Sequence, residues 1–302
     1  MRILLLGSAG QLGCDIAAAL ADRHELLCPD HDAAPVDDEH HIARFIAAHR
    51  PEIIINAAAF HDVEKCERDP ARAFAVNTLG PLYIARAADE IQASVYHFST
   101  DYVFSGAQQR PYEESDGPAP CNVYGHSKLA GEGFVLATRA GGYVLRVGAL
   151  YGAARCRGKG GRNFVRTMIE LCAKGTEIAV TDDELITPTC TADVARQTVH
   201  MIDANAPAGL YHATSQGDCS WLGFAQEIFA HLDLDVKLRP ARAGEFPMKI
   251  PRPRMSVLNN AALRRTGLDI MPPWQDALRN FIAAHRSLVC SWRNPSRLAH
   301  TQ

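Results

Sequence analysis

Short runs of consecutive apolar residues alternate with helical patterns along the first half of the chain. The runs are continuous, which is typical of strands buried on both faces of a parallel sheet. The segments between them repeat apolar residues at the spacing of an amphipathic helix. Strands are predicted at 3–6, 26–28, 53–56, 95–98 and 143–147, and helices at 16–20, 42–49, 70–93 and 122–138. This alternation predicts an α/β fold with a right-handed, doubly wound parallel sheet.

The second half of the chain is less regular and predicts a smaller α/β lobe over the carboxyl edge of the strands. We expect residues 1–152 to form the sheet domain and 153–290 mainly a substrate-binding lobe, with a tail at 291–302. Part of the later chain, about 177–203, is expected to return to the sheet domain. The charged run 61–67 is interpreted as a loop. Further helices are predicted at 163–173, 191–203, 221–232, 260–266 and 274–287, and strands at 177–180 and 209–213.

Composition and charge narrow the function classes. The 302 residues carry a formal net charge of -3, which gives no support to a nucleic-acid or membrane-surface role. No apolar run approaches the roughly 20 residues of a membrane span, and the N-terminus lacks a secretory signal. The nine cysteines include no CxxC pair, so a structural zinc site is not expected. Reduced thiols and a cytoplasmic location are the expectation.

A glycine pattern follows the first strand. Gly7, Gly10 and Gly13 form GxxGxxG between a predicted strand and a predicted helix. Glycines there let the backbone approach a pyrophosphate, and the helix start offers free N–H groups, here those of Gln11 and Leu12. A plain tight turn is the alternative. The position between strand and helix favours a dinucleotide-binding, Rossmann-type domain.

Two further stretches are candidates for cofactor contacts. Asp30 follows the second strand, where a carboxylate can bind an adenosine ribose and repel a 2′-phosphate. It is equally well explained as a solvated loop acid, so NADPH and NADH both remain candidates. Ala57, Ala58 and Ala59 end the third strand and leave room for a ligand, or simply pack well. Asn77 either lines the cofactor or is structural.

The candidate chemistry lies between Val95 and Lys128. Ser99 and Thr100 close the fourth strand, and Tyr124 and Lys128 lie four residues apart on one face of a predicted helix. A free phenol has a pKa near 10, and a nearby cation lowers it toward the range that general acid catalysis needs. A half-buried tyrosine beside a solvated lysine is the alternative for such a pair in isolation.

The motifs together resemble the extended short-chain dehydrogenase/reductase superfamily. They are GSAGQLG at 7–13, STDYVFSG at 99–106 and YGHSK at 124–128. INAAAFHDVEKCE, the run NVYGHSKLAGE and GRNF at 161–164 are similar, more narrowly, to the dTDP-4-dehydrorhamnose reductase family. The resemblance covers residues 1–152 most strongly and implies reduction by NADPH or NADH of the 4-keto group of a nucleotide-linked 6-deoxy sugar.

The resemblance also implies roles for individual residues. Thr100 matches the hydroxyl that binds the substrate carbonyl, Tyr124 the general acid, and Lys128 the cation that lowers the tyrosine pKa and holds the nicotinamide ribose. Related dehydratases carry Glu two residues after the Thr, where this chain has Tyr102, so the site resembles a simple reductase. Ser99 is a lesser candidate, beside the cofactor. The expected substrate contacts are Thr100, Asp101, Tyr102, Asn163 and Arg252.

Three positions depart from the family pattern. Ala149 occupies the place of a Trp that lies against the sugar nucleotide, and Met255 the place of an Asn in an RPxNS-like segment. Some family members dimerise through a magnesium site of glutamates. Here Asp15 is near one such position, but the second falls at Ala192 or Asp193, so no metal is expected. A homodimer is a possible assembly.

Two alternatives to this reductase stay open. The chain could be a non-catalytic regulatory subunit, because the regulatory β subunit of methionine adenosyltransferase resembles the same family. The turn after the fifth strand of that subunit also lacks the Trp, and it is similar to Leu150-Tyr151-Gly152 of this chain. It could also act as a reductase or epimerase on a different nucleotide sugar or a small ketone.

Overall fold

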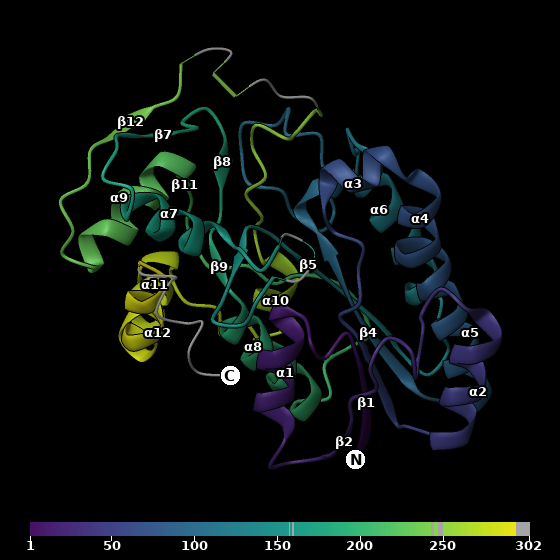
Figure 1. Ribbon diagram of the computed structural model, residues 1–302. Coiled ribbons are helices and arrows are strands. Elements are labelled where there is room, and N and C mark those ends of the chain that lie inside the picture. Colours follow the sequence, from purple (N-terminus) through teal and green to yellow (C-terminus); the bar gives the residue numbers. More distant parts are fainter. Residues whose placement is uncertain (157, 159, 243–244, 247–249, 294–302) are drawn as a thin grey trace.

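A six-stranded parallel sheet forms the centre of the molecule (Figure 1). The computed structural model describes residues 1–156, 158, 160–242, 245–246 and 250–293. The strand order is β10-β5-β4-β3-β1-β2. The strands are β1 (Arg2–Leu6), β2 (Glu25–Leu27), β3 (Ile53–Asn56), β4 (Ser94–Thr100), β5 (Gly142–Val147) and β10 (Gly209–His212). The predicted doubly wound α/β fold is confirmed. The winding reverses between β1 and β3, and open sheets of this kind bind ligands at the carboxyl ends of the strands beside that point.

Helices cover both faces of the sheet, which explains the continuous apolar runs. Ile3 and Leu5 pack with α1 (Gln11–Leu20) and α8 (Thr191–Asp203) on one face. Leu4 and Leu6 point the other way, into the core beneath α2, α5 and α6. These three helices are Glu39–His49, Gly80–Ile91 and Val123–Leu136. Each strand therefore buries alternate residues in two different cores.

The segment 61–93 differs from the prediction in two ways. The interpretation of 61–67 as a loop is wrong, because α3 (Val63–Arg68) begins there, capped by the Asp62 side chain, with Val63 and Cys66 buried. The helix predicted at 70–93 is α4 (Pro70–Phe74) followed by α5, with the π-helical turn Ala75–Leu79 between them. Such turns are rare and often occur beside functional sites.

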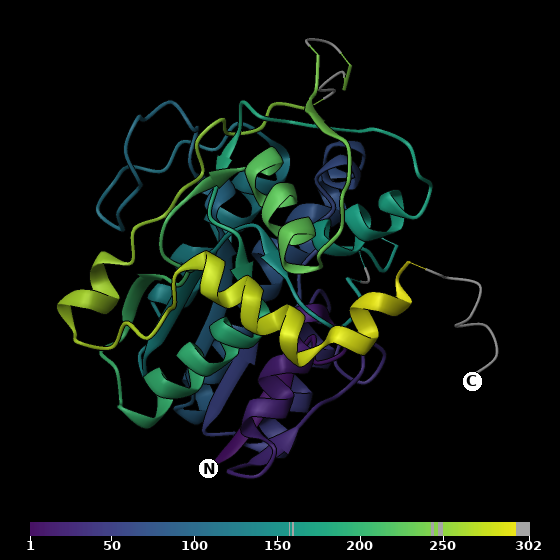
Figure 2. The same cartoon turned by 90° about the vertical axis from the view of Figure 1, so that its left-hand side faces the viewer.

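The second half of the chain builds a lobe around an aromatic core. Tyr151, Phe224, Trp274 and Phe281 are buried there together. The helices of the lobe are α7 (Phe164–Cys172), α9 (Trp221–His231), α11 (Trp274–Ala284) and α12 (Arg286–Ser291), and Figure 2 shows α11 and α12 running across the molecule below α9. Its short strands pair as β6 (Leu150–Tyr151) with β9 (Thr189–Cys190), β7 (Ile178–Val180) with β12 (Leu238–Pro240), and β8 (Leu185–Ile186) with β11 (Cys219–Ser220).

The later chain rejoins the central sheet through α8 and β10. Of the segment 177–203 expected to return, α8 packs against α1, whereas β7 pairs with β12 outside the sheet. β10 then adds the edge strand beside β5. Of the expected tail 291–302, residues from 294 on lie outside the described residues, and Trp292 is buried. No helix in the described ranges is both long and apolar enough to cross a bilayer.

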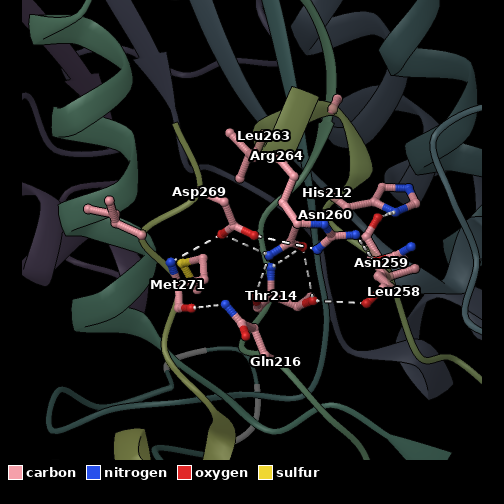
Figure 3. Close-up of polar contacts among 12 residues, drawn as sticks. His212, Thr214, Gln216, Leu258, Asn259, Asn260, Leu263, Arg264, Asp269 and Met271 are labelled. Atoms are coloured by element: carbon pink, nitrogen blue, oxygen red, sulfur yellow. Dashed lines mark hydrogen bonds and ion pairs between the residues drawn. The ribbon is translucent and has the colours of Figure 1, made fainter. Parts of the chain in front are cut away.

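The chain after β10 is tied to the segment 258–271 by a buried polar network (Figure 3). Asn260 Oδ1 accepts from Thr214 N at 3.2 Å, and its Nδ2 donates to Thr214 O at 2.8 Å. Gln216 Nε2 donates to Met271 O at 2.7 Å. The side chain of His212 contacts the carbonyls of Tyr112 and Asn259 at 3.1 and 3.2 Å. α10 (Ala261–Arg265) lies within the segment that this network holds beside β10.

Candidate active site

The glycine turn after β1 is packed directly against the end of β3. Gly7 has φ +77°, and a Cβ there would lie 2.6 Å from Ala58 N. A Cβ on Gly13 would lie 2.1 Å from Gly7 O. Gly10 N donates to Gly7 O at 2.9 Å, which closes the turn. Only glycine fits at positions 7 and 13 of this turn, and a tight glycine turn before a helix is the arrangement that a pyrophosphate site requires.

The start of α1 supplies the donors of this cradle. The first N–H groups of a helix have no partner within the helix, so those of Gln11 and Leu12 are available at its N-terminus. The side chain of Leu12 is buried in the core, and that of Gln11 donates to Gly152 O at 3.3 Å. Asp30 lies exposed three residues after β2, and its Oδ1 accepts from Ala33 N at 2.8 Å. These residues fit a dinucleotide through backbone groups and one carboxylate.

The alanines after β3 line the same edge, and Asn77 holds them in place. Asn77 is fully buried in the π-helical turn. Its amide donates to Phe60 O and accepts from Phe60 N, both at 2.8 Å, and donates to Ser127 Oγ at 3.0 Å. Because these bonds use the amide, a structural role of Asn77 is favoured over a contact with the cofactor. Asn77 fixes the end of the run 57–60.

Thr100 and Tyr124 meet at the carboxyl end of β4. The hydroxyl of Thr100 acts on the phenol of Tyr124 and lowers its pKa against the effect of burial, and Thr100 Oγ1 donates to Asp101 Oδ1 at 2.9 Å. Asn122 caps α6 by accepting from Gly125 N, which starts the helix two residues before Tyr124. Burial raises the pKa of Tyr124, so its phenol is protonated at neutral pH. A protonated phenol beside a hydroxyl can donate to a carbonyl oxygen placed between them.

Lys128 lies one turn further along α6 and faces β4. Its side chain is 1% exposed, and Nζ lies 3.1 Å from His97 Nε2. Burial lowers the pKa of Lys128 to about 7, and Glu132 opposes that shift. The hydrogen bond that the structure gives to Lys128 Nζ is therefore the one with His97.

Three of the remaining predicted substrate residues, Asp101, Tyr102 and Arg252, lie near Thr100. Asp101 is buried, which raises its pKa to about 6, and it bonds to Thr100 and Ser256. Arg252 is exposed and close enough to Tyr102 to lower the pKa of its phenol against the effect of burial. These side chains therefore gather around Thr100, with Asp101 orienting its hydroxyl and Arg252 presenting a cation to solvent.

Asn163 lies apart from this group. Its Nδ2 donates to Gly152 O at 2.8 Å, and its Oδ1 accepts from Arg166 N to cap α7. Both ends of the amide are thus used within the protein, and its contacts give no support to a substrate role.

Two positions that depart from the family pattern have defined places. Ala149 adopts a left-handed backbone with φ +43° and packs against the lobe core. Met255 forms a bridge with Leu185, so the chain around it runs beside β8. Both positions thus contact elements of the C-terminal lobe.

The region compared with a magnesium site is occupied by internal contacts. Asp15 accepts a hydrogen bond from the Thr191 hydroxyl, and Asp193 pairs with Arg196. Among the described residues, no group of three or more His, Cys, Asp or Glu side chains could hold a metal ion.

Ser99 faces away from Thr100 into a buried ion pair. Ser99 Oγ donates to Glu132 Oε1, and Glu132 accepts from Arg146 at 2.9 and 2.7 Å. The side chains of Glu132 and Arg146 are 4% and 3% exposed. Sequence reasoning placed Ser99 beside the cofactor. In the structure its hydroxyl instead supports the pair that joins α6 to β5.

Breaking this pair is expected to destabilise the protein. Glu132→Gln leaves the Arg146 charge buried without a counter-ion, which costs about 3–5 kcal/mol. Glu39→Gln is the matched control, because Glu39 pairs with Arg86 at the surface and its loss costs at most about 1 kcal/mol. Urea unfolding measures both, and equal midpoints for the two variants would contradict the role of the buried pair.

Sequence reasoning missed the residues beneath Lys128. Asn56 and His97 are polar residues inside the apolar strands β3 and β4, and both are at most 1% exposed. A polar residue within a fully buried strand needs a partner, and that pattern was the available signal.

Comparisons with known proteins agree with this arrangement. The model of the RmlD substrate binding domain family matches residues 1–287. A dTDP-4-dehydrorhamnose reductase of Mycolicibacterium smegmatis is 36% identical over 94% of this chain and 85% of its own length. The spore coat polysaccharide biosynthesis protein SpsK of Bacillus subtilis is 33% identical over 96% of this chain and 99% of its own.

Solved structures give the same result. A dTDP-4-dehydrorhamnose reductase of Clostridium acetobutylicum superposes with a TM-score of 0.88 at 38% identity, covering 95% of this chain and 100% of that one. The corresponding protein of Bacillus anthracis, in complex with NADP, gives 0.87 at 33% identity, covering 94% and 99%. The resemblance noted in the sequence is thereby confirmed, and the chain belongs to the RmlD substrate-binding domain family, whose named members include dTDP-4-dehydrorhamnose reductases.

Proposed function

We propose that this protein is an NAD(P)H-dependent reductase of the 4-keto group of a nucleotide-linked 6-deoxy sugar, converting dTDP-4-dehydrorhamnose to dTDP-L-rhamnose. The observation that carries the proposal is the proximity of the Thr100 hydroxyl and the Tyr124 phenol at the sheet edge that also holds the glycine cradle. Relatives at 35–37% identity over 92–94% of the chain bear reductase or ketoreductase names, and the Bacillus anthracis structure carries NADP.

The chain's own groups account for carbonyl reduction. A bound nicotinamide cofactor supplies the hydride. Thr100 and Tyr124 would hold the ketone oxygen, and the phenol of Tyr124 would give its proton to that oxygen as negative charge develops. Asp101 Oδ1 accepts the hydrogen bond of the Thr100 hydroxyl, so that hydroxyl would turn from Asp101 to the ketone oxygen when the substrate binds. The ammonium form of Lys128 would stabilise the phenolate left behind.

The site favours simple reduction over elimination of water. Tyr102 stands where related dehydratases carry a glutamate base, and its ring lies edge-on to Tyr124 with centroids 5.9 Å apart. Burial raises the pKa of Tyr102, so it stays a neutral phenol at neutral pH. A neutral phenol does not replace a carboxylate base.

The nucleotide is proposed to bind on the lobe side, near Arg252. Arg252 is exposed beside Tyr102, and guanidinium groups bind phosphates with paired hydrogen bonds. Small Ala149 opens the position where the family carries Trp. No nucleic-acid partner is proposed, and the homodimer remains a prediction that sedimentation would test.

Cofactor oxidation tests the proposal. The 4-keto-6-deoxy sugars of dTDP, UDP and GDP are each offered with NADPH and with NADH, and we expect turnover with the dTDP sugar. Turnover with only a UDP or GDP sugar would reassign the substrate. Turnover with none, together with co-purification of a larger enzyme, would favour the regulatory subunit.

A further inference from the structure

A row of buried polar side chains runs beneath the candidate site. It starts at the backbone of Ala58 and passes through Asn56 on β3 and His97 on β4 to Lys128 on α6. Asn56 Oδ1 lies 3.1 Å from Ala58 N, and Asn56 Nδ2 lies 3.1 Å from His97 Nδ1. His97 Nε2 lies 3.1 Å from Lys128 Nζ. All three side chains are at most 1% exposed, so water does not substitute for any of these partners.

The direction of every hydrogen bond in this row follows from the bond at its start, between Ala58 N and Asn56. A backbone N–H only donates, so the atom of Asn56 that faces Ala58 is the amide oxygen. The Asn56 NH₂ group therefore faces His97 Nδ1, which must accept. A neutral imidazole that accepts at Nδ1 carries its proton on Nε2. That Nε2–H can only donate, and the atom it meets is Lys128 Nζ.

We propose that His97 holds Lys128 as a neutral amine in the cofactor-free protein, by donating its Nε2–H to the lone pair of Nζ. An ammonium group has no lone pair, so an N–H of Lys128 Nζ would face the N–H of His97 Nε2, and two donors would meet. His97 is thus a positioning residue that acts through Lys128, and Asn56 sets its tautomer.

Among the described residues, Glu132 is the carboxylate that favours the charged form of Lys128, and it is paired with Arg146. Glu132 is one turn away on the same helix, but its carboxylate is used by Arg146 of β5 and by Ser99. Arg72 of α4 and Arg86 of α5 pair with Asp37 and Glu39 instead. One turn earlier on α6, the titratable groups that act on Tyr124 are Cys66 on α3 and Asp101 and Tyr102 after β4, and Glu67 of α3 accepts from Val123 N.

Burial acts in the same direction as the hydrogen bonds. It lowers the pKa of Lys128 to about 7 and the pKa of His97 well below its ordinary value, with Lys128 contributing to the second shift. At pH 8 both groups are then neutral, as the donor pattern requires.

The consequence for the cofactor rests on the proposed function. A ribose diol and a developing phenolate are bound best by the ammonium form of Lys128. Cofactor binding would therefore add one proton from solvent to Lys128 Nζ. Above pH 7 the dissociation constant of the cofactor should then rise about tenfold per pH unit, because each unit lowers the fraction of protein with an ammonium Lys128 about tenfold.

Asn56→Asp tests the tautomer with little change of shape. Its second oxygen can accept from Nδ1–H, which moves the imidazole proton to Nδ1 and makes Nε2 an acceptor for a Lys128 ammonium. The NADH dissociation constant is measured by fluorescence from pH 6 to 9. We expect it to begin to rise at a pH at least one unit higher in Asn56→Asp than in the wild type. Lys128→Met should remove this rise altogether.

Asn205→Asp is the control for the added charge. Asn205 is exposed just after α8 and should keep the wild-type profile. Superimposable profiles of Asn56→Asp and the wild type, or an unchanged rise in Lys128→Met, would overturn the proposal.

Neutron diffraction on the deuterated wild type needs neither a variant nor turnover. At pD 8.5 we expect deuterium on His97 Nε2, none on Nδ1, and two on Lys128 Nζ. Deuterium on Nδ1 with three on Nζ would refute the proposal even if the protein is an active reductase. The expected pattern in a protein without reductase activity would uphold it while the proposed function fails.

Discussion

Tyr124→Phe is expected to lower kcat for ketone reduction by roughly 10²–10⁴-fold, the usual contribution of a positioned general acid. The variant removes one hydroxyl and leaves the ring that packs edge-on to Tyr102. The cradle at Gly7 and Gly13 is untouched, so the affinity for cofactor should stay within a few-fold of the wild type.

Tyr143→Phe is the control for this substitution. Tyr143 donates its hydroxyl to Ala206 O at 3.0 Å, away from the site, so its loss should cost about 1 kcal/mol of stability and leave kcat unchanged. Stopped-flow measurement of cofactor oxidation separates the chemical step from product release. Equal single-turnover rates for Tyr124→Phe and the wild type would remove Tyr124 from the reaction.

Gly13→Ala is expected to weaken cofactor binding by about 10–100-fold. Its Cβ would lie 2.1 Å from Gly7 O and 2.8 Å from Ser8 Cα, both backbone atoms, so the turn must open. Overpacking of this kind costs about 1–3 kcal/mol, and each 1.4 kcal/mol is a factor of ten in affinity.

Gly133→Ala provides the matched control for this prediction. Gly133 is exposed on α6 with no atom within 4 Å of an added Cβ. Alanine there should stabilise the helix by about 0.5–1 kcal/mol and leave cofactor affinity unchanged. Calorimetric titration with NADPH and NADH measures both variants. Wild-type affinity in Gly13→Ala would show that the turn does not form the pyrophosphate site.

The sheet and the glycine turn could be predicted because their physical signals are local. Continuous apolar runs such as Ile53–Ile55 report burial on both faces, and the structure pairs them in one parallel sheet. The helix cap at Asn122 likewise lies directly before its helix. In contrast, α3 was missed because its charged surface outweighed the two buried residues, Val63 and Cys66.

The partners of individual polar side chains could not be predicted. Asn163, Asn77 and Ser99 have residue types that suit ligand binding, yet contacts with residues distant in sequence use their polar atoms. His97 could be noticed as a polar residue in an apolar strand, but its partner could not be identified because Lys128 is 31 positions away along the chain. Such pairings depend on how α6 packs against β4, which no local pattern encodes.

The identity of the sugar depends on the lobe, where the sequence signal is weakest. Ala149 and Met255 follow no family pattern, and their places beside the lobe core and β8 emerge only from the fold. The redox residues, in contrast, come from two consecutive elements, β4 and α6.

Transfer of deuterium from the cofactor to the sugar tests the central claim most directly. The purified protein is incubated with dTDP-4-dehydrorhamnose and NADPH deuterated at C4 of the nicotinamide, and the sugar is analysed by NMR. We predict dTDP-L-rhamnose with deuterium at sugar C4, formed by the wild type and strongly reduced in Tyr124→Phe. Recovery of the unreduced keto sugar, with NADPH and with NADH, would contradict the assignment of this protein as a reductase of that substrate.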